Sequence, residues 1–417
     1  MKRYNTCEVR PDFKEQLMGI GMNYWDAPSG PGNLPYWQEN VMYALSEGEV
    51  DRILDATQEL HNMSMEMVGQ TVRSGDYPEY FKLTPLEIAL IEQSWKRGDK
   101  SLYGRFDLAL GTDNSLEMFE YNGDTPVSIL ECSVAQWDKV RQLKTLPNGT
   151  PFPDEFRTQF NLIDETLKEV WPTIANPNKP LFFGSSGGFR HEDFGNLVYL
   201  MDSALRSGMQ VKEIQMEEIG LNLDSKPEFR DLDDKRIDQI FKLYPWEWMA
   251  TEDFGKNVFD TDDTKWIEPA WKMLLSNKAM LIKLWEMFPN HPNLLPSFIE
   301  QPRSGIYAKK AIHGREGSNI YISRCYSGEE RSLELAQGSH SVPEYDHWGY
   351  MYQQWHDVKK FDGYYPNFGS WVIGDKACGM SIREDQNIVT GNNAFFASHF
   401  FVPEHLQDEH KSIWLPD

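Results

Sequence analysis

The segment RFDLALGTDNSLEMFEYN, which begins at Arg105, predicts a β-hairpin, because apolar and polar residues alternate on both sides of a central turn. Arg105 and Asp107 lie two residues apart on the first strand, as do Glu120 and Asn122 on the second. Side chains two residues apart on a strand point to the same face. An even loop, such as 111–114, would place both pairs on one face, whereas an odd loop would separate them.

On one face, the four side chains would suit both a metal ion and an anion. Carboxylate and amide oxygens are the hard ligands that Mg²⁺ prefers, and Mg²⁺ commonly shares its coordination sphere with nucleotide phosphates. The guanidinium of Arg105 suits a carboxylate or a phosphate. A solvated hairpin with ordinary cross-strand ion pairs is the alternative, and the pattern alone leaves both interpretations open.

Composition argues against several classes of partner. The net charge is −23 and no run of Lys and Arg is present, so we expect no nucleic-acid partner. No apolar run approaches the ~18 residues of a membrane span, and the N-terminal residues lack a signal-like apolar core. The cysteines show no CxxC spacing and indicate a reducing compartment: Cys7, Cys132, Cys325 and Cys378. We therefore expect a cytoplasmic protein that does not bind membranes.

The chain of 417 residues is long enough for two or three subdomains. The expected class is mixed α/β (α+β), in three approximate parts. Residues 1–150 would hold a helical segment and the metal- and acid-binding hairpin. Residues 151–265 would form an open α/β subdomain, and residues 266–417 a nucleotide-binding antiparallel sheet with its lid.

Local patterns support this division. Residues up to about Lys100 are expected to be mostly helical, and Ser46 and Glu49 form a capping-box pattern ahead of an apolar stripe that starts at Val50. Further on, a strand, a glycine loop, a helix and a second strand over residues 180–214 predict an open α/β unit. The loop matches neither GxGxxG nor the P-loop pattern, so a tight turn is favoured over a phosphate site.

A second hairpin is predicted in IYAKKAIHGREGSNIYISR. Lys309 and Lys310 point to opposite faces of its first strand, so only one of them can face a site. A lysine beside a glycine-flanked loop can neutralise nucleotide phosphates, and Gly314 and Gly317 would let the loop close and exclude water. An exposed hairpin with ordinary surface charge is the alternative.

Five segments together resemble the glutathionylspermidine synthase family, and more closely its stand-alone synthetase members. They are the first hairpin with its following loop (RFD…EYNGDTPVSILE), LYPWEWM at 243–249, and residues 266–296, 307–320 and 369–385. The bifunctional members carry an additional Cys–His amidase domain. We expect none in this chain, so Cys7 is not interpreted as an amidase nucleophile.

The resemblance implies an ATP-grasp-like synthetase that uses ATP and Mg²⁺. Such an enzyme activates a glutathione-type peptide carboxylate as an acyl phosphate and joins it to a polyamine such as spermidine. Two alternatives stay open: the same ligase chemistry on a different peptide and amine, or a nucleotide-binding protein without ligase activity. The oligomeric state is not indicated.

The resemblance also implies roles for individual residues. The magnesium ligands would be Asp107, Glu120 and Asn122, and Arg105 would hold the reacting carboxyl group. Nucleotide contacts are implied for Lys278, Lys310, Gln353 and Arg383, with Gly314 and Gly317 in the covering loop. The peptide pocket is implied for Asp124, Thr125, Ser128 and Glu131. Lys310 is preferred to Lys309 because it keeps the family's spacing to the Gly-Arg of the loop.

Overall fold

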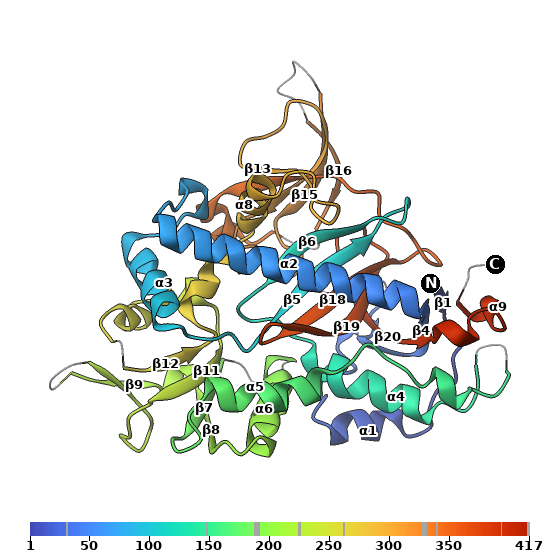
Figure 1. Cartoon of the computed structure of the whole chain (residues 1–417), viewed down its shortest axis with the longest axis horizontal. Coiled ribbons are helices and arrows are strands. Elements are labelled where there is room, and N and C mark those ends of the chain that lie inside the picture. Colours follow the sequence, from blue (N-terminus) through green and yellow to red (C-terminus); the bar gives the residue numbers. More distant parts are fainter. Residues whose placement is uncertain are drawn as a thin grey trace.

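The structure is a computed structural model, and three sheets with helices packed on them dominate it (Figure 1). The residues that it describes are 1–30, 32–146, 149–186, 192–223, 227–261, 263–326, 332–338, 341–392 and 394–414. This arrangement confirms the mixed α/β class. The end of the predicted glycine loop, at Gly187 and Gly188, lies outside the described residues.

The largest sheet joins strands from both ends of the chain. Its strands follow the order β1 (Lys2–Tyr4), β4 (Trp37–Ser46), β20 (Phe395–Val402), β19 (Lys376–Asp385), β18 (Tyr365–Ile373), β5 (Tyr103–Leu110) and β6 (Leu116–Asn122). β4 and β20 run parallel, and the other neighbours run antiparallel. The polar hairpin β5–β6 is therefore fixed at one edge, beside a strand from the last third of the chain. The three predicted subdomain limits stay a prediction.

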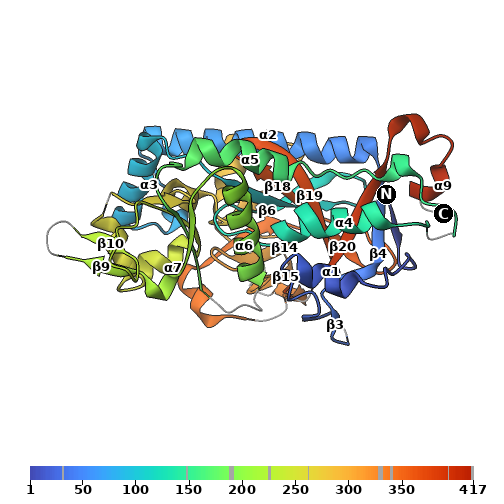
Figure 2. The same ribbon diagram turned by 90° about the horizontal axis from the view of Figure 1, so that it is seen from below.

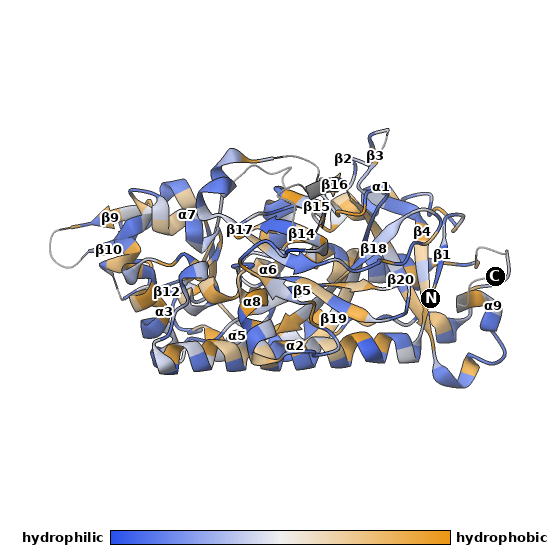
Figure 3. Cartoon of the chain, turned by 90° about the horizontal axis from the view of Figure 1, so that it is seen from above, coloured by the Kyte–Doolittle hydropathy of each residue, from blue (hydrophilic) through white to orange (hydrophobic). Residues whose placement is uncertain are grey.

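The long helix α2 (Glu47–Ser74) packs against the large sheet, mainly on β18 and β19 (Figures 1 and 2). The predicted capping box is confirmed, because the backbone N–H of Glu49 donates to Ser46 Oγ and Glu49 accepts from the N–H of Ser46. Apolar and polar residues alternate along the helix (Figure 3), and its buried side chains include Val50 and Met67. The expectation of mostly helix before residue 100 was wrong for residues 1–46, because β1 and β4 there complete the sheet edge.

The predicted open α/β unit is a four-stranded parallel sheet. Its strands follow the order β12 (Lys265–Ile267), β11 (Gln239–Leu243), β7 (Leu181–Ser185) and β8 (Val211–Gln215). Helix α6 (Glu192–Arg206) packs on β7 and β8, whereas α5 (Ile163–Ile174) contacts α6 and also β18 and β19 of the large sheet. These two helices therefore connect the α/β unit to the sheet that carries the polar hairpin.

The lysine hairpin belongs to an antiparallel sheet of five strands. The strands follow the order β13 (Ser297–Phe298), β17 (Tyr350–Gln354), β14 (Gly305–Ala311), β15 (Ile320–Cys325) and β16 (Ser332–Gln337). Helix α8 (Met280–Met287) precedes this sheet in the chain and contacts both α2 and β13. The sheet is thus held against the helix that covers the large sheet.

The other α-helices and strands are smaller than α2 and lie outside the three main sheets. They are α1 (Phe13–Gly19), α3 (Pro85–Arg97), α4 (Gln136–Gln142), α7 (Trp246–Thr251), α9 (Lys411–Trp414), β2 (Pro28–Ser29), β3 (Leu34–Pro35), β9 (Gly220–Asn222) and β10 (Glu228–Arg230). Tyr4 and Ile413, which lie near opposite ends of the chain, are in contact: the hydroxyl of Tyr4 donates to the carbonyl of Ile413 at 2.7 Å. Among the described helices, none has the length and apolar character that a membrane crossing requires.

Candidate active site

The β5–β6 hairpin does not have the even loop on which its predicted geometry depended. Leu110 pairs with Leu116, so five residues separate the last paired positions. The register then shifts by one residue, because Phe119 is the extra residue of a β-bulge. Asp107 consequently lies opposite Glu120. The predicted even loop was wrong, but the bulge shifts the register by one residue and so compensates for the odd loop.

Because the bulge also pairs Arg105 with Asn122, all four polar side chains share one face of the hairpin. Arg105 forms a two-pronged contact with Asp107, with Nε to Oδ1 at 2.7 Å and Nη2 to Oδ2 at 3.1 Å. It also donates to the carbonyl of Val127 at 2.7 Å. Burial opposes its charge, but Asp107 outweighs burial and raises the pKa of Arg105. The guanidinium therefore remains a fixed cation.

Glu120 is also paired with a cation. Lys278 Nζ lies 2.8 Å from Glu120 Oε2 and donates to the carbonyl of Gly314 at 2.6 Å. Burial opposes ionisation of Glu120, but Lys278 and Lys310 outweigh it and lower its pKa to about 2. The carboxylate is thus ionised at neutral pH, and Asn122 Nδ2 lies 3.4 Å from its other oxygen.

The tertiary structure separates the two neighbouring lysines of β14. Lys310 is 5 % exposed and lines a cleft beside the polar hairpin. Its Nζ donates to Gln353 Oε1 at 2.6 Å and to the carbonyl of Phe119 at 2.9 Å. Lys309 lies on the other face, with Nζ 3.9 Å from the centre of the Tyr350 ring. Burial, with Lys278 adding to it, lowers the pKa of Lys310 to about 8, although Glu120 opposes this shift. Only Lys310 faces the site.

Most of the predicted site residues line one cleft. It lies between the polar hairpin, the five-stranded sheet and the carboxyl ends of β7 and β11, the edge where open parallel sheets bind ligands. The predicted residues that line it are Arg105, Asp107, Glu120, Asn122, Thr125, Lys310, Gly317, Gln353 and Arg383. Lys278 reaches the same site through its contact with Glu120.

Arg383, on β19, lines the cleft. Its Nη2 donates to the carbonyl of Gly391 at 2.8 Å, while its buried Nε has no partner among the described residues. Burial raises the pKa of Glu131 and of Glu192, and the positive charge of Arg383 opposes both shifts. The guanidinium thus keeps donor capacity for a bound anion.

The predicted peptide-pocket residues divide into two sets. Thr125 lines the cleft, and Ser128 Oγ lies 3.4 Å from Arg105 Nη1. Asp124 and Glu131 are fully buried behind the cleft wall. Lys242 donates to Asp124 at 2.7 Å, and Glu131 Oε1 accepts from a tyrosine hydroxyl, whereas its Oε2 has no partner among the described residues.

The two loop glycines have different surroundings. Gly317 adopts φ +71°, and a Cβ there would lie 2.6 Å from the carbonyl oxygen of Thr390, so both conformation and space require glycine. A Cβ at Gly314 would lie 3.0 Å from the carbonyl oxygen of Ser318, a tight contact. The carbonyl of Gly314 is the acceptor for Lys278. The loop therefore connects directly to the predicted phosphate-binding lysine.

Four charged residues that line the cleft were not predicted: Glu192, Asp193, Arg315 and Glu316. Glu192 and Asp193 begin α6 and line the cleft, and Arg315 enters it from the 313–317 loop. Burial, with Glu131 and Asp193 adding to it, raises the pKa of Glu192 to about 7, although Arg383 opposes the shift. Arg315 was visible in the sequence as the cationic residue of the glycine-flanked loop. Glu192 had no local signal beyond its place after the glycine loop.

The donor set of the hairpin fits Mg²⁺. Asp107 and Glu120 supply two carboxylates on directly opposed strand positions, and Asn122 supplies an amide oxygen beside them. Mg²⁺ is usually held by one or two carboxylates and completes its sphere with water and phosphate oxygens. Across the described ranges, no group of three or more His, Cys, Asp and Glu side chains is arranged for a metal.

Comparison with known proteins places this geometry in a family. The family model described as "Glutathionylspermidine synthase preATP-grasp" matches residues 4–402. The chain belongs to the glutathionylspermidine synthase family. The resemblance seen in the sequence is thereby confirmed, and the chain is an enzyme of a ligase family.

Members of the family differ in how far they resemble this chain. A protein of Haemophilus influenzae named "Putative acid--amine ligase" is 42% identical over 410 residues, which cover 97% of this chain and all of the relative. Trypanothione synthetase of Crithidia fasciculata is 28% identical, over 82% of this chain and 53% of that protein. The bifunctional glutathionylspermidine synthetase/amidase of Escherichia coli is 23% identical, over 83% of this chain and 57% of that protein.

A solved structure supports the fold. The glutathione synthetase like-effector of Globodera pallida superposes with a TM-score of 0.52 at 11% identity, covering 95% of this chain and all of that one. With the family match, this confirms the predicted ATP-grasp-like synthetase fold.

Proposed function

We propose that this enzyme is an ATP- and Mg²⁺-dependent carboxylate–amine ligase that joins a glutathione-type peptide to a polyamine such as spermidine. The single observation that carries the proposal is that Lys278 and Lys310 both contact the hairpin that presents Asp107 and Glu120 to the cleft. Lys278 contacts Glu120 at 2.8 Å, and Lys310 lies on the strand that faces the same hairpin. This arrangement combines a place for a metal with a place for phosphates.

The cationic side chains of the site would contact different substrates. Lys278, Lys310 and Arg383 would neutralise the charge that spreads over the nucleotide phosphates during phosphoryl transfer. Arg105 would hold the peptide carboxylate in line and then stabilise the oxyanion that forms when the amine attacks. Asp107, Glu120 and Asn122 would hold Mg²⁺, which when bound would neutralise phosphate charge as a Lewis acid.

An attacking amine must be neutral, so a group must take its proton. Glu192 lines the cleft, and its pKa of about 7 suits a general base that works near neutral pH. The acidic side chains Asp193 and Glu316 line the same region and would favour a cationic amine before it is deprotonated. Glu192 is therefore the proposed proton acceptor.

The assay that tests the function is ADP release measured against a panel of acids and amines. Strict dependence on glutathione plus spermidine supports the proposed pair. Stimulation by another peptide and amine would keep the ligase chemistry but change the substrates. ADP release that no acid and amine stimulate would favour a nucleotide-binding protein without ligase activity.

A further inference from the structure

Arg315 joins the tip of the lysine hairpin to two other parts of the molecule. Its Nη1 donates to Thr125 Oγ1 at 2.9 Å, and its Nη2 donates to Glu247 Oε1 at 2.5 Å. Thr125 follows the polar hairpin, and Glu247 lies in α7 of the α/β unit. Burial opposes ionisation of Glu247, but Arg315 outweighs it and lowers the pKa of Glu247 to about 2. We call the set of Arg315, Thr125 and Glu247 the closing contact.

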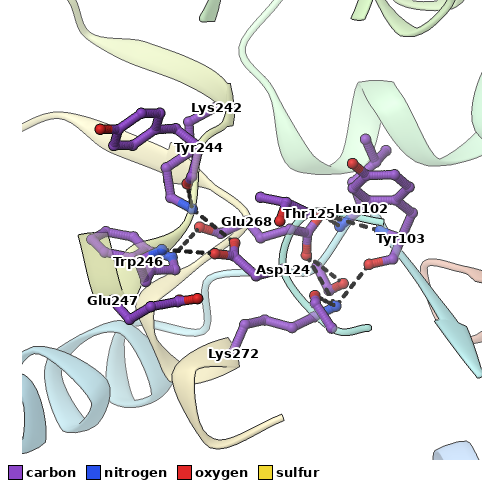
Figure 4. Close-up of polar contacts among 12 residues, drawn as sticks. Leu102, Tyr103, Asp124, Thr125, Lys242, Tyr244, Trp246, Glu247, Glu268 and Lys272 are labelled. Carbon is purple, nitrogen blue, oxygen red and sulfur yellow. Dashed lines mark hydrogen bonds and ion pairs between the residues drawn. The ribbon is translucent and has the colours of Figure 1, made fainter. Parts of the chain in front are cut away.

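Buried hydrogen bonds connect the two segments that carry the acceptors of the closing contact. Asp124, the neighbour of Thr125, accepts the backbone N–H of Trp246, the neighbour of Glu247, at 2.9 Å. Lys242 Nζ donates to the other oxygen of Asp124 at 2.7 Å, and both side chains are fully buried (Figure 4). A buried carboxylate with both oxygens engaged has little freedom to move. The spacing of the two acceptors is therefore fixed from inside the protein.

Lys272 also holds the segment that leads from β6 to Thr125. Its Nζ donates to the carbonyls of Gly123 at 2.6 Å and Tyr103 at 2.7 Å, and it lies 3.2 Å from buried Glu268. Gly123 directly follows β6, and Tyr103 begins β5. Lys272 and Asp124 thus fix the loop between the polar hairpin and Thr125 from two sides (Figure 4).

We propose that the closing contact seals the cleft over the activated acid, and that Asp124 is a positioning residue for it rather than a substrate ligand. This inference rests on the proposed ligase function. In an unsealed site, water attacks the acyl carbon of the acyl phosphate. The bond between that carbon and the bridging oxygen breaks, inorganic phosphate leaves with the bridging oxygen, and water supplies the oxygen of the regenerated acid and releases a proton. The net reaction would be hydrolysis of ATP to ADP and phosphate without amide formation.

The test uses Arg315→Met and Glu247→Gln in the full chain, with Arg324→Met as a matched control. Arg324 is an exposed arginine of β15, in the same sheet but outside the cleft lining. Both closing-contact variants are expected to raise the amide hydrogen exchange of residues 313–317 at least tenfold. They should also raise ADP formed per amide formed from about one to above five, while the control leaves both unchanged.

Asp124→Asn tests the positioning role, because it keeps an oxygen acceptor for the Trp246 N–H but removes the charge paired with Lys242. It should raise ADP formed per amide formed at temperatures well below its midpoint of unfolding, which a general loss of stability would not do. Wild-type exchange in Arg315→Met and Glu247→Gln would overturn the closing contact. A ratio that stays at one despite faster exchange would overturn its sealing role. If no acid and amine support turnover, the ligase function fails, but the exchange comparison still decides whether the contact exists.

Discussion

Lys278 Nζ lies 2.8 Å from Glu120 Oε2, so a residue placed just before α8 neutralises a carboxylate on the second strand of the polar hairpin. The contact joins the predicted phosphate-binding part of the site to its predicted metal-binding part. The same lysine also donates to the carbonyl of Gly314, in the loop that bears Arg315. One side chain therefore links three functional elements.

Removing either hairpin carboxylate should abolish ATP turnover. Asp107→Ala and Glu120→Ala are each expected to lower ADP release by at least about 100-fold, because the charge that holds a divalent cation is lost. Thermal unfolding should show that the fold is retained. Glu117→Ala is the matched control, since Glu117 lies on the same strand but outside the cleft lining. Wild-type ADP release in either cleft variant would refute the metal assignment.

Arg105→Ala should separate nucleotide binding from ligation. We expect amide formation to fall by about 10²–10³, because the group that stabilises the oxyanion is gone, while the Kd for ATP is nearly unchanged. Calorimetric titration of ATP, compared with rates of amide formation, checks this. Arg105→Lys should recover little activity, since an ammonium cannot make the two-pronged contact. A large loss of ATP affinity would instead make Arg105 a nucleotide ligand.

The two adjacent lysines of β14 provide a matched pair. Lys310→Met should weaken ATP binding strongly, whereas Lys309→Met should have little effect, because only Lys310 faces the cleft. Lys310 is charged below its pKa of about 8 and loses its charge above it, so ATP affinity should decline as pH rises past 8. That decline should disappear in Lys310→Arg. Equal effects of the two methionine substitutions would contradict the assignment.

Glu192 should set the acidic limb of the pH profile for amide formation. A general base acts in its ionised form, so with a pKa of about 7 the rate should rise as pH increases through 7. Glu192→Gln should lower the rate of amide formation and remove this rise, while exposed Glu155→Gln should not. Initial rates at saturating substrates between pH 5.5 and about 8.5 provide the measurement. An unchanged limb in Glu192→Gln would exclude Glu192 as the proton acceptor.

The local sequence was sufficient to predict the elements that depend on interactions between neighbouring residues. The capping box at Ser46 and Glu49, the apolar stripe of α2 and the strand–helix–strand order of the α/β unit follow from periodicity and end signals. The alternation of Arg105 and Asp107, and of Glu120 and Asn122, likewise follows from the period of a strand.

Other features depended on contacts between segments distant in sequence. The loop of the hairpin is odd, and only the bulge at Phe119 restores the shared face, which no count of residues could reveal. β1 and β4 belong to a sheet with C-terminal strands, so their nature was hidden from the N-terminal sequence alone.

The residue types of the site and the hairpins that carry them follow from the amino-acid sequence alone, because strand alternation acts over two residues. Which of these side chains meet depends instead on how distant segments pack. This packing turned Lys310 and not Lys309 toward the cleft, and it brought Arg315 onto Thr125 and Glu247. It also buried Asp124 against Lys242, because pairing with a cation there compensates for the loss of water around its charge.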